Sequence, residues 1–387
     1  MPTLAASEVE RTLLRANRQI RAGRTPHPSD TDWTVRKGTV WLRRPSAVVD
    51  FYQFWFRTRG CTFDRGGQCS MCNYGVGPEI DPDAVHRSVA ARIASVPEGS
   101  LIYLSPSGSL FDEREVPVGL RRNLLRSVAR RRPVGFTFET RPEFCSPRLL
   151  DEVQSFLPGA AVACHLGVES WDPDKRRRCH LKRTPTACYE TAARELRARR
   201  IAPIANITLG GLGLSPAEAY EDTLATIRGT RAARFAIQML FPLSAKQGSL
   251  LGWAHEQGLW EPPSLWLLIR ALRTATVEAY AADEAGDLSL SWYNPQVGEV
   301  VTARPDSCPV CRPMLIDTLK AFALTPSADS LGEAARWDRC GCRSRAERDL
   351  TGNQDGYQER LEAIAARWTE TTGQPPRFTG DTGTARG

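Results

Sequence analysis

The chain has 387 residues, and 41% of them are hydrophobic, which is enough for a folded core and excludes disorder along its whole length. Its apolar runs are too short to cross a bilayer, and residues 1–23 lack the apolar stretch of a secretory signal, so we expect a cytoplasmic protein without a membrane partner. The net charge of +7 comes mostly from arginine in residues 121–133 and 174–183, and it suits a phosphate-bearing partner and a solvated surface equally.

The first two regions differ in their pattern. Residues 1–44 are expected to form a polar, helical lead-in, whereas from 45 to 243 short β-like runs alternate with helix-like stretches. This alternation is typical of βαβ units and a parallel sheet, so we predict an α/β fold, a partial (β/α)6-type barrel. The expected strands are 48–56, 100–107, 133–140, 161–170, 202–210 and 235–243, and the expected helices are 118–131, 146–155, 184–199 and 215–231.

The pattern changes after residue 243. Residues 244–350 are expected to form a helical region, with one long helix after a Pro-Pro pair and four cysteines near its end. Residues 351–387 are expected to form a helix and a disordered tail, because 370–387 are rich in glycine, threonine and proline.

Three cysteines lie close together in residues 60–75, directly after the first strand of the predicted barrel. They are Cys61, Cys69 and Cys72, separated by seven residues and then by two. A structural zinc site needs four protein ligands, whereas a four-iron cluster held by three thiolates leaves one iron open. Because loops at the carboxyl ends of barrel strands build active sites, we expect this loop to hold such a cluster.

This loop resembles that of the radical S-adenosylmethionine (SAM) superfamily. There, three cysteines after the first strand hold a [4Fe–4S] cluster, and the amino and carboxylate groups of SAM bind the open iron. The first gap of seven residues is similar to that of the branch containing the Elongator catalytic subunit. The resemblance implies a radical SAM barrel, two cofactors and an external one-electron reductant such as flavodoxin or ferredoxin.

The resemblance also implies where SAM binds. Met71 occupies the position that contacts the adenine of SAM in the family. The turn after the second strand occupies the position that binds the SAM amino group. Glu139 and Arg141 take the position of a ribose and carboxylate contact, with an ordinary ion pair as the alternative. Glu169 is expected at the barrel mouth, and glycines after the fifth strand are expected near adenine or ribose. The remaining expected SAM-binding residues are Ser107, Gly108, Ser109, Gly210 and Gly211.

A narrower resemblance covers roughly residues 45–345. Residues 105–117, 139–144 and 241–272 are similar to segments of the archaeosine-forming radical SAM family. That family removes a hydrogen from a lysine attached to a 7-deazaguanine in tRNA, after which a C–N bond breaks and an amidine remains. Residues 180–184 depart from the related turn. The expected substrate is therefore a tRNA carrying a modified base, with a small molecule of natural-product biosynthesis as the alternative.

A second group of cysteines lies near the end of the chain. Two residues lie between Cys308 and Cys311, one residue lies between Cys340 and Cys342, and 28 residues separate the pairs. Four thiolates from two short turns suit a tetrahedral zinc site, which is our first expectation. An auxiliary iron–sulfur cluster uses the same ligands, and unliganded thiols are the third possibility. Residues 314–324 and Trp337 are expected to give the site a small core.

A rival hypothesis from another class remains at this stage. In it the protein is not an enzyme: both cysteine groups hold structural zinc, and the arginine runs contact nucleic acid. For the enzyme hypothesis no general base is identified. Gln238, Gln247 and Trp266 are weaker candidates for contact with substrate, and core packing is the expected role of Trp266.

Overall fold

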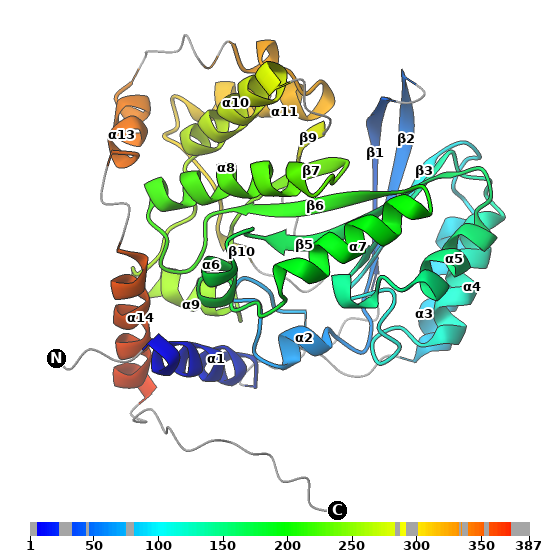
Figure 1. Cartoon of the computed structure of the whole chain (residues 1–387), viewed down its shortest axis with the longest axis horizontal. Coiled ribbons are helices and arrows are strands. Elements are labelled where there is room, and N and C mark those ends of the chain that lie inside the picture. The colour runs from blue at the N-terminus through cyan, green and yellow to red at the C-terminus, as the bar shows by residue number, and fades with distance from the viewer. Residues whose placement is uncertain are drawn as a thin grey trace, which may run out of the picture.

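One curved sheet with helices along its outer side dominates the computed structural model (Figure 1). The structure describes residues 6–22, 33–43, 46–74, 81–282, 287–291, 301–332, 334, 340–351 and 356–372. The sheet has eight strands in the order β1-β2-β3-β4-β5-β6-β7-β9. Their bounds are Trp33–Arg43, Ser46–Phe56, Leu101–Pro106, Gly135–Thr140, Ala161–Glu169, Ile201–Leu209, Ile237–Pro242 and Asp287–Leu290.

The six predicted strands are confirmed as β2 to β7, and they run parallel. Two further strands extend the sheet at its edges. β9 pairs parallel with β7, and β1 pairs antiparallel with β2 in register from Trp33 opposite Phe56 to Arg43 opposite Ser46. The lead-in is therefore helical only over α1 (Ala6–Ala22), and the expectation of helix across residues 33–43 was wrong. Valine, threonine and tryptophan favour an extended strand there.

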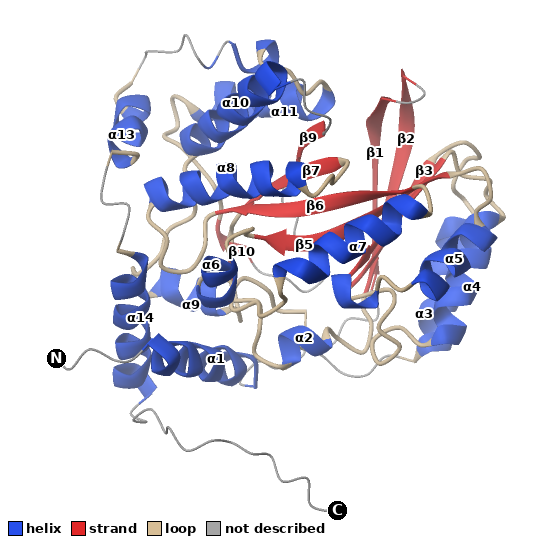
Figure 2. Ribbon diagram, viewed as in Figure 1, coloured by secondary structure: helices blue, strands red, loops and turns tan. Residues whose placement is uncertain are grey.

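The four predicted helices between the strands are confirmed as α4 (Val118–Ala129), α5 (Pro147–Phe156), α7 (Thr186–Ala198) and α8 (Pro216–Ala232). With α3 (Pro82–Ile93) and the short α6 (Pro173–Arg178), they connect successive strands along one side of the sheet (Figure 2). Each crossover through a helix is what allows neighbouring strands to run parallel.

The two faces of the sheet differ in exposure. Along β7, residues 237, 239 and 241 are half-buried, whereas 238, 240 and 242 are fully buried. β9 shows the same alternation, and half-buried residues also recur at every second position in most of β5. Because successive side chains of a strand point to opposite faces, one face packs on the helices and the other lines an open concave interior.

Several shorter elements close the fold around the ends of the strands. They are α2 (Thr62–Arg65), η1 (Pro142–Phe144), β8 (Ala245–Lys246), α9 (Leu250–Glu256), β10 (Val301–Ala303), η2 (Asp329–Leu331) and α13 (Cys342–Asp349). The long helix predicted after the Pro-Pro pair is α10 (Leu265–Ala282), and α11 (Arg312–Leu324) follows it. The last helix, α14 (Tyr357–Thr372), packs beside α1 (Figure 1).

None of the helices within the described ranges combines the length and the apolar character needed to cross a membrane. Trp337 and residues 373–387 lie outside the described residues, so the expectations for them stay predictions. The proposed division into four regions likewise stays a prediction.

Candidate active site

The three-cysteine loop follows β2 at the carboxyl edge of the sheet. Cys61 precedes the single-turn helix α2, while Cys69 and Cys72 follow it. Cys69 is buried and adopts a positive φ of 61°, and the other two thiols are half-buried. Burial, reinforced by the charges of Glu115 and Asp64, raises the pKa of the Cys61 thiol to about 12. The hydrogen bond between the other two thiols raises the pKa of Cys69 and lowers that of Cys72.

The loop offers three thiols, and within the described ranges no set of four ligands converges there. Cys69 and Cys72 are hydrogen-bonded to each other. Among the described residues, one group of cysteine, histidine and carboxylate ligands is close enough to share one ion, and it is the C-terminal cysteine group. A structural zinc ion needs four protein ligands, so the rival hypothesis in which both cysteine groups hold structural zinc is disfavoured.

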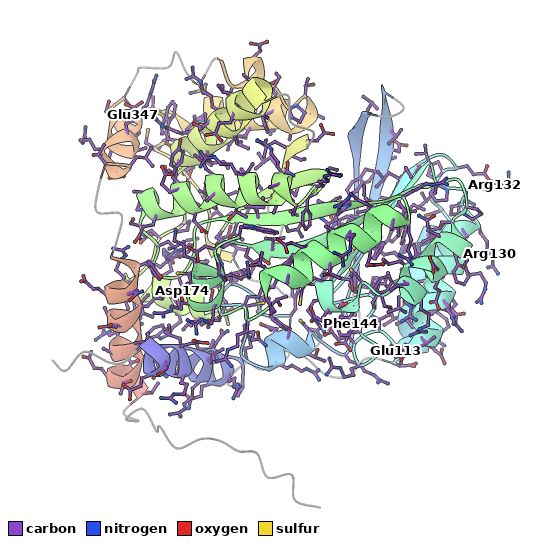
Figure 3. The ribbon with its side chains drawn as sticks, viewed as in Figure 1. Glu113, Arg130, Arg132, Phe144, Asp174 and Glu347 are labelled. Atoms are coloured by element: carbon purple, nitrogen blue, oxygen red, sulfur yellow. The ribbon has the colours of Figure 1, made fainter. Side chains whose placement is uncertain are left out.

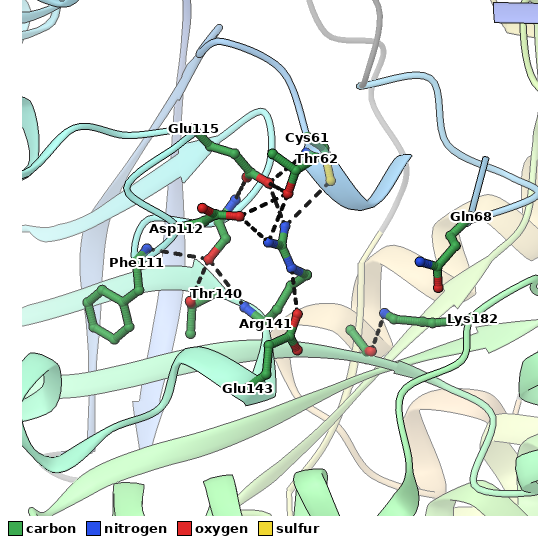
Figure 4. Close-up of polar contacts among 12 residues, drawn as sticks. Cys61, Thr62, Gln68, Phe111, Asp112, Glu115, Thr140, Arg141, Glu143 and Lys182 are labelled. Atoms are coloured by element: carbon green, nitrogen blue, oxygen red, sulfur yellow. Dashed lines mark hydrogen bonds and ion pairs between the residues drawn. The ribbon is translucent and has the colours of Figure 1, made fainter. Parts of the chain in front are cut away.

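Arg141, at the end of β4, is the centre of a buried ionic network beside Cys61 (Figure 4). Its guanidinium donates to Asp112 and Glu115 at 2.5 and 2.6 Å, and to Glu143 at 2.8 Å. It also lies 3.7 Å from the Sγ of Cys61. The guanidinium therefore joins the cysteine loop to the loop after β3, and its donors are already engaged by protein groups.

The Ser-Gly-Ser turn after β3 is held by the same network. Ser107 Oγ accepts a hydrogen bond from the backbone N–H of Thr58 at 2.9 Å, and the Ser109 N–H donates to Glu115 Oε2 at 2.6 Å. Gly108 has a φ of +136°, and a Cβ built there would overlap the Glu115 carboxylate. Glycine is thus required both by the backbone conformation and by the close approach of this carboxylate.

Glu139 lies in a different environment from Arg141, and these two described side chains make no ion pair with each other. Its carboxylate accepts hydrogen bonds from Tyr103 Oη and, at 2.7 Å, from Ser105 Oγ, both on β3. Burial raises the pKa of this carboxyl. The alternative of an ordinary ion pair between Glu139 and Arg141 is therefore wrong: the first faces the concave interior, and the second faces the cysteine loop. Their expected contacts with SAM stay a prediction.

A histidine that sequence reasoning missed lies next to Glu139 in the interior. His165 on β5 stands opposite Glu139, and its ring stacks on Tyr103 with centroids 5.0 Å apart. Its Nδ1 is 2.7 Å from Asn206 Oδ1 on β6, so Nδ1–H is the donor. Burial lowers the pKa of His165 to about 4, so the ring is neutral at pH 7. The signal in the sequence was available: His165 and Glu169 share one face of a strand at even spacing.

Lys182 is a second functional candidate that the sequence did not single out. It belongs to residues 180–184, which depart from the related families, and it is buried. Its Nζ donates to Glu169 Oε1 at 3.0 Å and to the carbonyl of Gly167. Although burial opposes its charge, Tyr189, Glu169 and Cys69 together raise the pKa of Lys182. A permanent ammonium group thus lies between the predicted barrel-mouth residue Glu169 and the cysteine loop.

The remaining predicted SAM-binding residues lie along the same edge. Met71 is buried within the cysteine loop. Gly210 has a φ of +106°, and a Cβ on Gly211 would lie 2.8 Å from Leu214 Cδ1 and 3.2 Å from the His180 ring. Both ring nitrogens of His180, a fully buried side chain, lack a hydrogen-bond partner among the described groups.

The structure separates the three weaker candidates. Gln238 is on the helix-facing side of β7, where its Nε2 donates to the carbonyl of Phe235 at 3.1 Å, so it does not line the interior. Gln247 is exposed near β8, and its carbonyl accepts from Asn73 Nδ2 at 3.3 Å. Trp266 is buried in the hydrophobic core, as expected.

The arginine runs are only partly a surface feature. Arg121 and Arg176 are among the largest fully buried side chains. Arg121 donates to Glu152 at 2.9 Å, and Arg176 donates to the carbonyls of Ser170 and Thr184. Arg130 and Arg132 are exposed on the outer side of the sheet, away from the cysteine loop (Figure 3). Some of these arginines are therefore buried and bind other protein groups instead of forming a basic surface.

The four C-terminal cysteines converge on one point. Their Sγ atoms all lie within 4.8 Å of one another, with Cys308 and Cys340 3.6 Å apart. A tetrahedral ion with 2.3 Å bonds requires edges of about 3.8 Å. The backbone N–H of Cys311 lowers the pKa of the Cys308 thiol to about 6, and the Cys342 N–H donates to Cys340 Sγ at 3.4 Å. The geometry fits one metal ion, and it is too compact for a four-iron cluster.

Two curated proteins and one solved structure are similar to this chain. No protein-family model matches the chain. Archaeosine synthase subunit beta of Methanosarcina acetivorans is 26% identical over 287 residues, which cover 72% of this chain and 80% of that protein. An uncharacterized protein of Methanocaldococcus jannaschii is 22% identical over 56% of this chain and 62% of that protein.

A solved structure is also similar. The archaeal Elp3 of Methanocaldococcus infernus has a TM-score of 0.46 at 16% identity, over 63% of this chain and 60% of that one. The chain therefore spans less than two thirds of this protein and of the M. jannaschii relative.

Proposed function

We propose that the chain is a radical SAM enzyme of the branch that contains Elp3, and that Cys61, Cys69 and Cys72 hold a [4Fe–4S] cluster that binds SAM. The observation that carries this proposal is the set of three thiols on a loop at the carboxyl edge of the sheet, where no fourth ligand among the described residues completes a site for one ion. Cationic side chains of Arg141, Lys182 and Lys246 near the thiols suit the negative charge of such a cluster.

The cluster and SAM, when bound, supply a 5′-deoxyadenosyl radical that removes a hydrogen atom from the substrate. This chain's residues have to orient SAM and substrate and exclude water. We assign the SAM contacts to the carboxyl ends of five strands, β2 to β6, and the segments that follow them: Met71; Ser107, Gly108 and Ser109; Glu139 and Arg141; Glu169; and Gly210 and Gly211. Arg141 and the two serines already bond protein groups, so their first role is to shape the pocket rather than to contact SAM.

We propose that the substrate is a lysine adduct of a 7-deazaguanine in tRNA and that C–N bond cleavage leaves an amidine on the base. Support comes from the relative named archaeosine synthase subunit beta. The concave interior adds support because it presents hydrogen-bonding groups suited to a polar substrate. The neutral ring of His165 offers Nε2 as an acceptor, and Glu139 offers its second oxygen.

We further propose that Cys308, Cys311, Cys340 and Cys342 hold one zinc ion. Their compact spacing and the backbone N–H groups aimed at two of the sulfurs support a closed tetrahedral site. The zinc has a structural role and ties the segment before α11 to the start of α13. An external flavodoxin or ferredoxin of the cytoplasm is the proposed reductant.

One anaerobic assay tests the proposed substrate. The enzyme is reduced with SAM present and offered either tRNA carrying the lysine adduct or the free adduct nucleoside, and both 5′-deoxyadenosine and the amidine are measured. Amidine formation on tRNA is expected. Formation of 5′-deoxyadenosine without amidine would reject this substrate and leave a natural-product substrate to be tested. Absence of both products would reject the proposal as a whole.

A further inference from the structure

The amino-terminal helix α1 contacts the cysteine loop, although more than 40 residues separate them in the chain. Three of its side chains donate hydrogen bonds to backbone carbonyls between residues 64 and 72. Asn17 and Arg21 are buried, and Arg18 Nε donates to the Gly66 carbonyl at 2.9 Å. Nothing in the sequence of the helix marks these residues as parts of the site.

Arg21 binds next to two of the three thiols. Its Nη2 donates to the carbonyls of Cys69 and Cys72, each at 2.9 Å, and its Nη1 donates to the carbonyl of Asp64 at 3.1 Å. The guanidinium also forms a buried ion pair with the Asp64 side chain. A planar fork that holds two carbonyls at once fixes their relative orientation, and with it the positions of the attached thiols.

Asn17 extends this contact to a third part of the fold. Its Nδ2 donates to the Gly67 carbonyl at 2.9 Å, and its Oδ1 accepts from the backbone N–H of Leu250 at 3.2 Å. The helix backbone lies directly against the loop, because a Cβ on Gly67 would be 2.8 Å from the Leu14 carbonyl oxygen. The loop is therefore enclosed between α1 and the start of α9 rather than extended into solvent.

We propose that Arg21 is a positioning residue that pre-forms the cysteine loop for its cluster. The inference rests on the proposed function for the identity of the cluster. It adds that α1 is part of the active site's framework. The alternative is a purely structural role, in which Arg21 only attaches α1 to the barrel.

The chain offers a matched control for that alternative. Glu10, also on α1, forms ion pairs with Arg183 at 2.9 Å and with Arg177 at 3.3 Å. These contacts fasten the helix to the barrel, and in the described part of the chain the Glu10 carboxylate makes no bond to the cysteine loop. Glu10→Gln therefore weakens attachment of the helix without touching the loop.

The test compares Arg21→Gln, Arg21→Lys and Glu10→Gln in the full-length protein. The first readout is amide hydrogen exchange of residues 64–74 in the metal-free protein. The second is the rate at which a chelator removes iron from the reconstituted protein. Arg21→Gln should raise both rates about tenfold or more, because a buried charged donor is lost. Arg21→Lys should give intermediate rates, since one ammonium group cannot copy the fork, and Glu10→Gln should match the wild type.

Equal rates in Arg21→Gln and Glu10→Gln would overturn the proposal. If Arg21→Gln fails to fold, Arg21→Lys decides: rates equal to those of the wild type reject the positioning role. The two proposals fail differently. A wild-type protein that retains no iron would reject the proposed cluster. Hydrogen exchange of the metal-free protein would still test whether Arg21 positions the loop.

Discussion

Arg141 Nη1 lies 3.7 Å from the Sγ of Cys61, and the same nitrogen donates to Glu115 at 2.6 Å. This contact links the two loops on which the proposed function depends. Two carboxylates beside Arg141, those of Asp112 and Glu115, are almost inaccessible to solvent, so their charges rely on neighbouring guanidinium groups. Changes in this network are therefore expected to act on the loops as well as on SAM.

Arg141→Ala and Glu139→Ala should differ in their effects. Removing Arg141 takes a cation away from the buried carboxylate of Glu115 and leaves Asp112 with Arg114 alone, so both stability and SAM binding should fall. Glu139→Ala removes hydrogen bonds from Tyr103 and Ser105, so the SAM requirement should rise while the cluster stays intact. Thermal melting and SAM titration of both variants measure the difference. Unchanged SAM binding in both variants would show that Arg141 and Glu139 have a purely structural role.

Gly108→Ala should damage the turn after β3. The new Cβ would overlap the Glu115 carboxylate, and a φ of +136° is strained for alanine. We expect a lower melting temperature and weaker SAM binding. Gly119→Ala is the control, because that glycine lies in α4 with no atom within 4 Å of a built Cβ. It should be neutral or stabilising by up to about 1 kcal/mol. A Gly108→Ala protein as stable as Gly119→Ala would show that the turn tolerates a side chain.

His165 should contribute a pH dependence to stability. Burial lowers its pKa to about 4, below the usual value near 6.5. Between these values the unfolded state binds more protons, so stability falls as pH is lowered through this window, by at most about 1.4 kcal/mol per pH unit for one histidine. Urea unfolding of the wild type and His165→Gln at pH 7 and pH 4.5 measures this contribution. The stability difference between the two pH values should shrink in the variant; an unchanged difference would contradict a buried neutral His165.

Changing the C-terminal cysteines tests whether their metal site is structural or takes part in the reaction. If they hold zinc, elemental analysis should find about one zinc per chain besides the iron. Cys340→Ala should lower yield and stability, because metal binding is coupled to folding of that region, while surviving protein should still cleave SAM. Cys188→Ala, a half-buried thiol outside both groups, is the control. A second reducible iron–sulfur signal that disappears with Cys340→Ala would replace zinc with an auxiliary cluster.

Local sequence patterns predicted the strands and their parallel order, because hydrophobic periodicity can be seen directly in the sequence. They also predicted that the four C-terminal cysteines lie together, because the spacing of metal ligands can be seen in the same way. The edge strand β1 was missed because its apolar residues do not alternate regularly with polar ones: Lys37, Gly38 and Thr39 interrupt them. The contacts of Arg21 with Cys69 and Cys72 could not be foreseen, since they join segments about 50 residues apart through backbone carbonyls, which carry no sequence signal. The ion pair of Lys182 with Glu169 joins residues 13 apart, and it was missed because it depends on how the segment after α6 folds back onto the end of β5.

The central claim is tested most directly by anaerobic reconstitution of the wild type and of Cys61→Ala, Cys69→Ala and Cys72→Ala with iron and sulfide, followed by reduction in the presence of SAM. The account predicts a brown wild-type protein with about four irons in the loop cluster, and formation of 5′-deoxyadenosine. Each single variant should lose both the loop iron and the product, with Cys188→Ala behaving as the wild type. A colourless wild-type protein, or full 5′-deoxyadenosine formation by any of the three variants, would contradict the account.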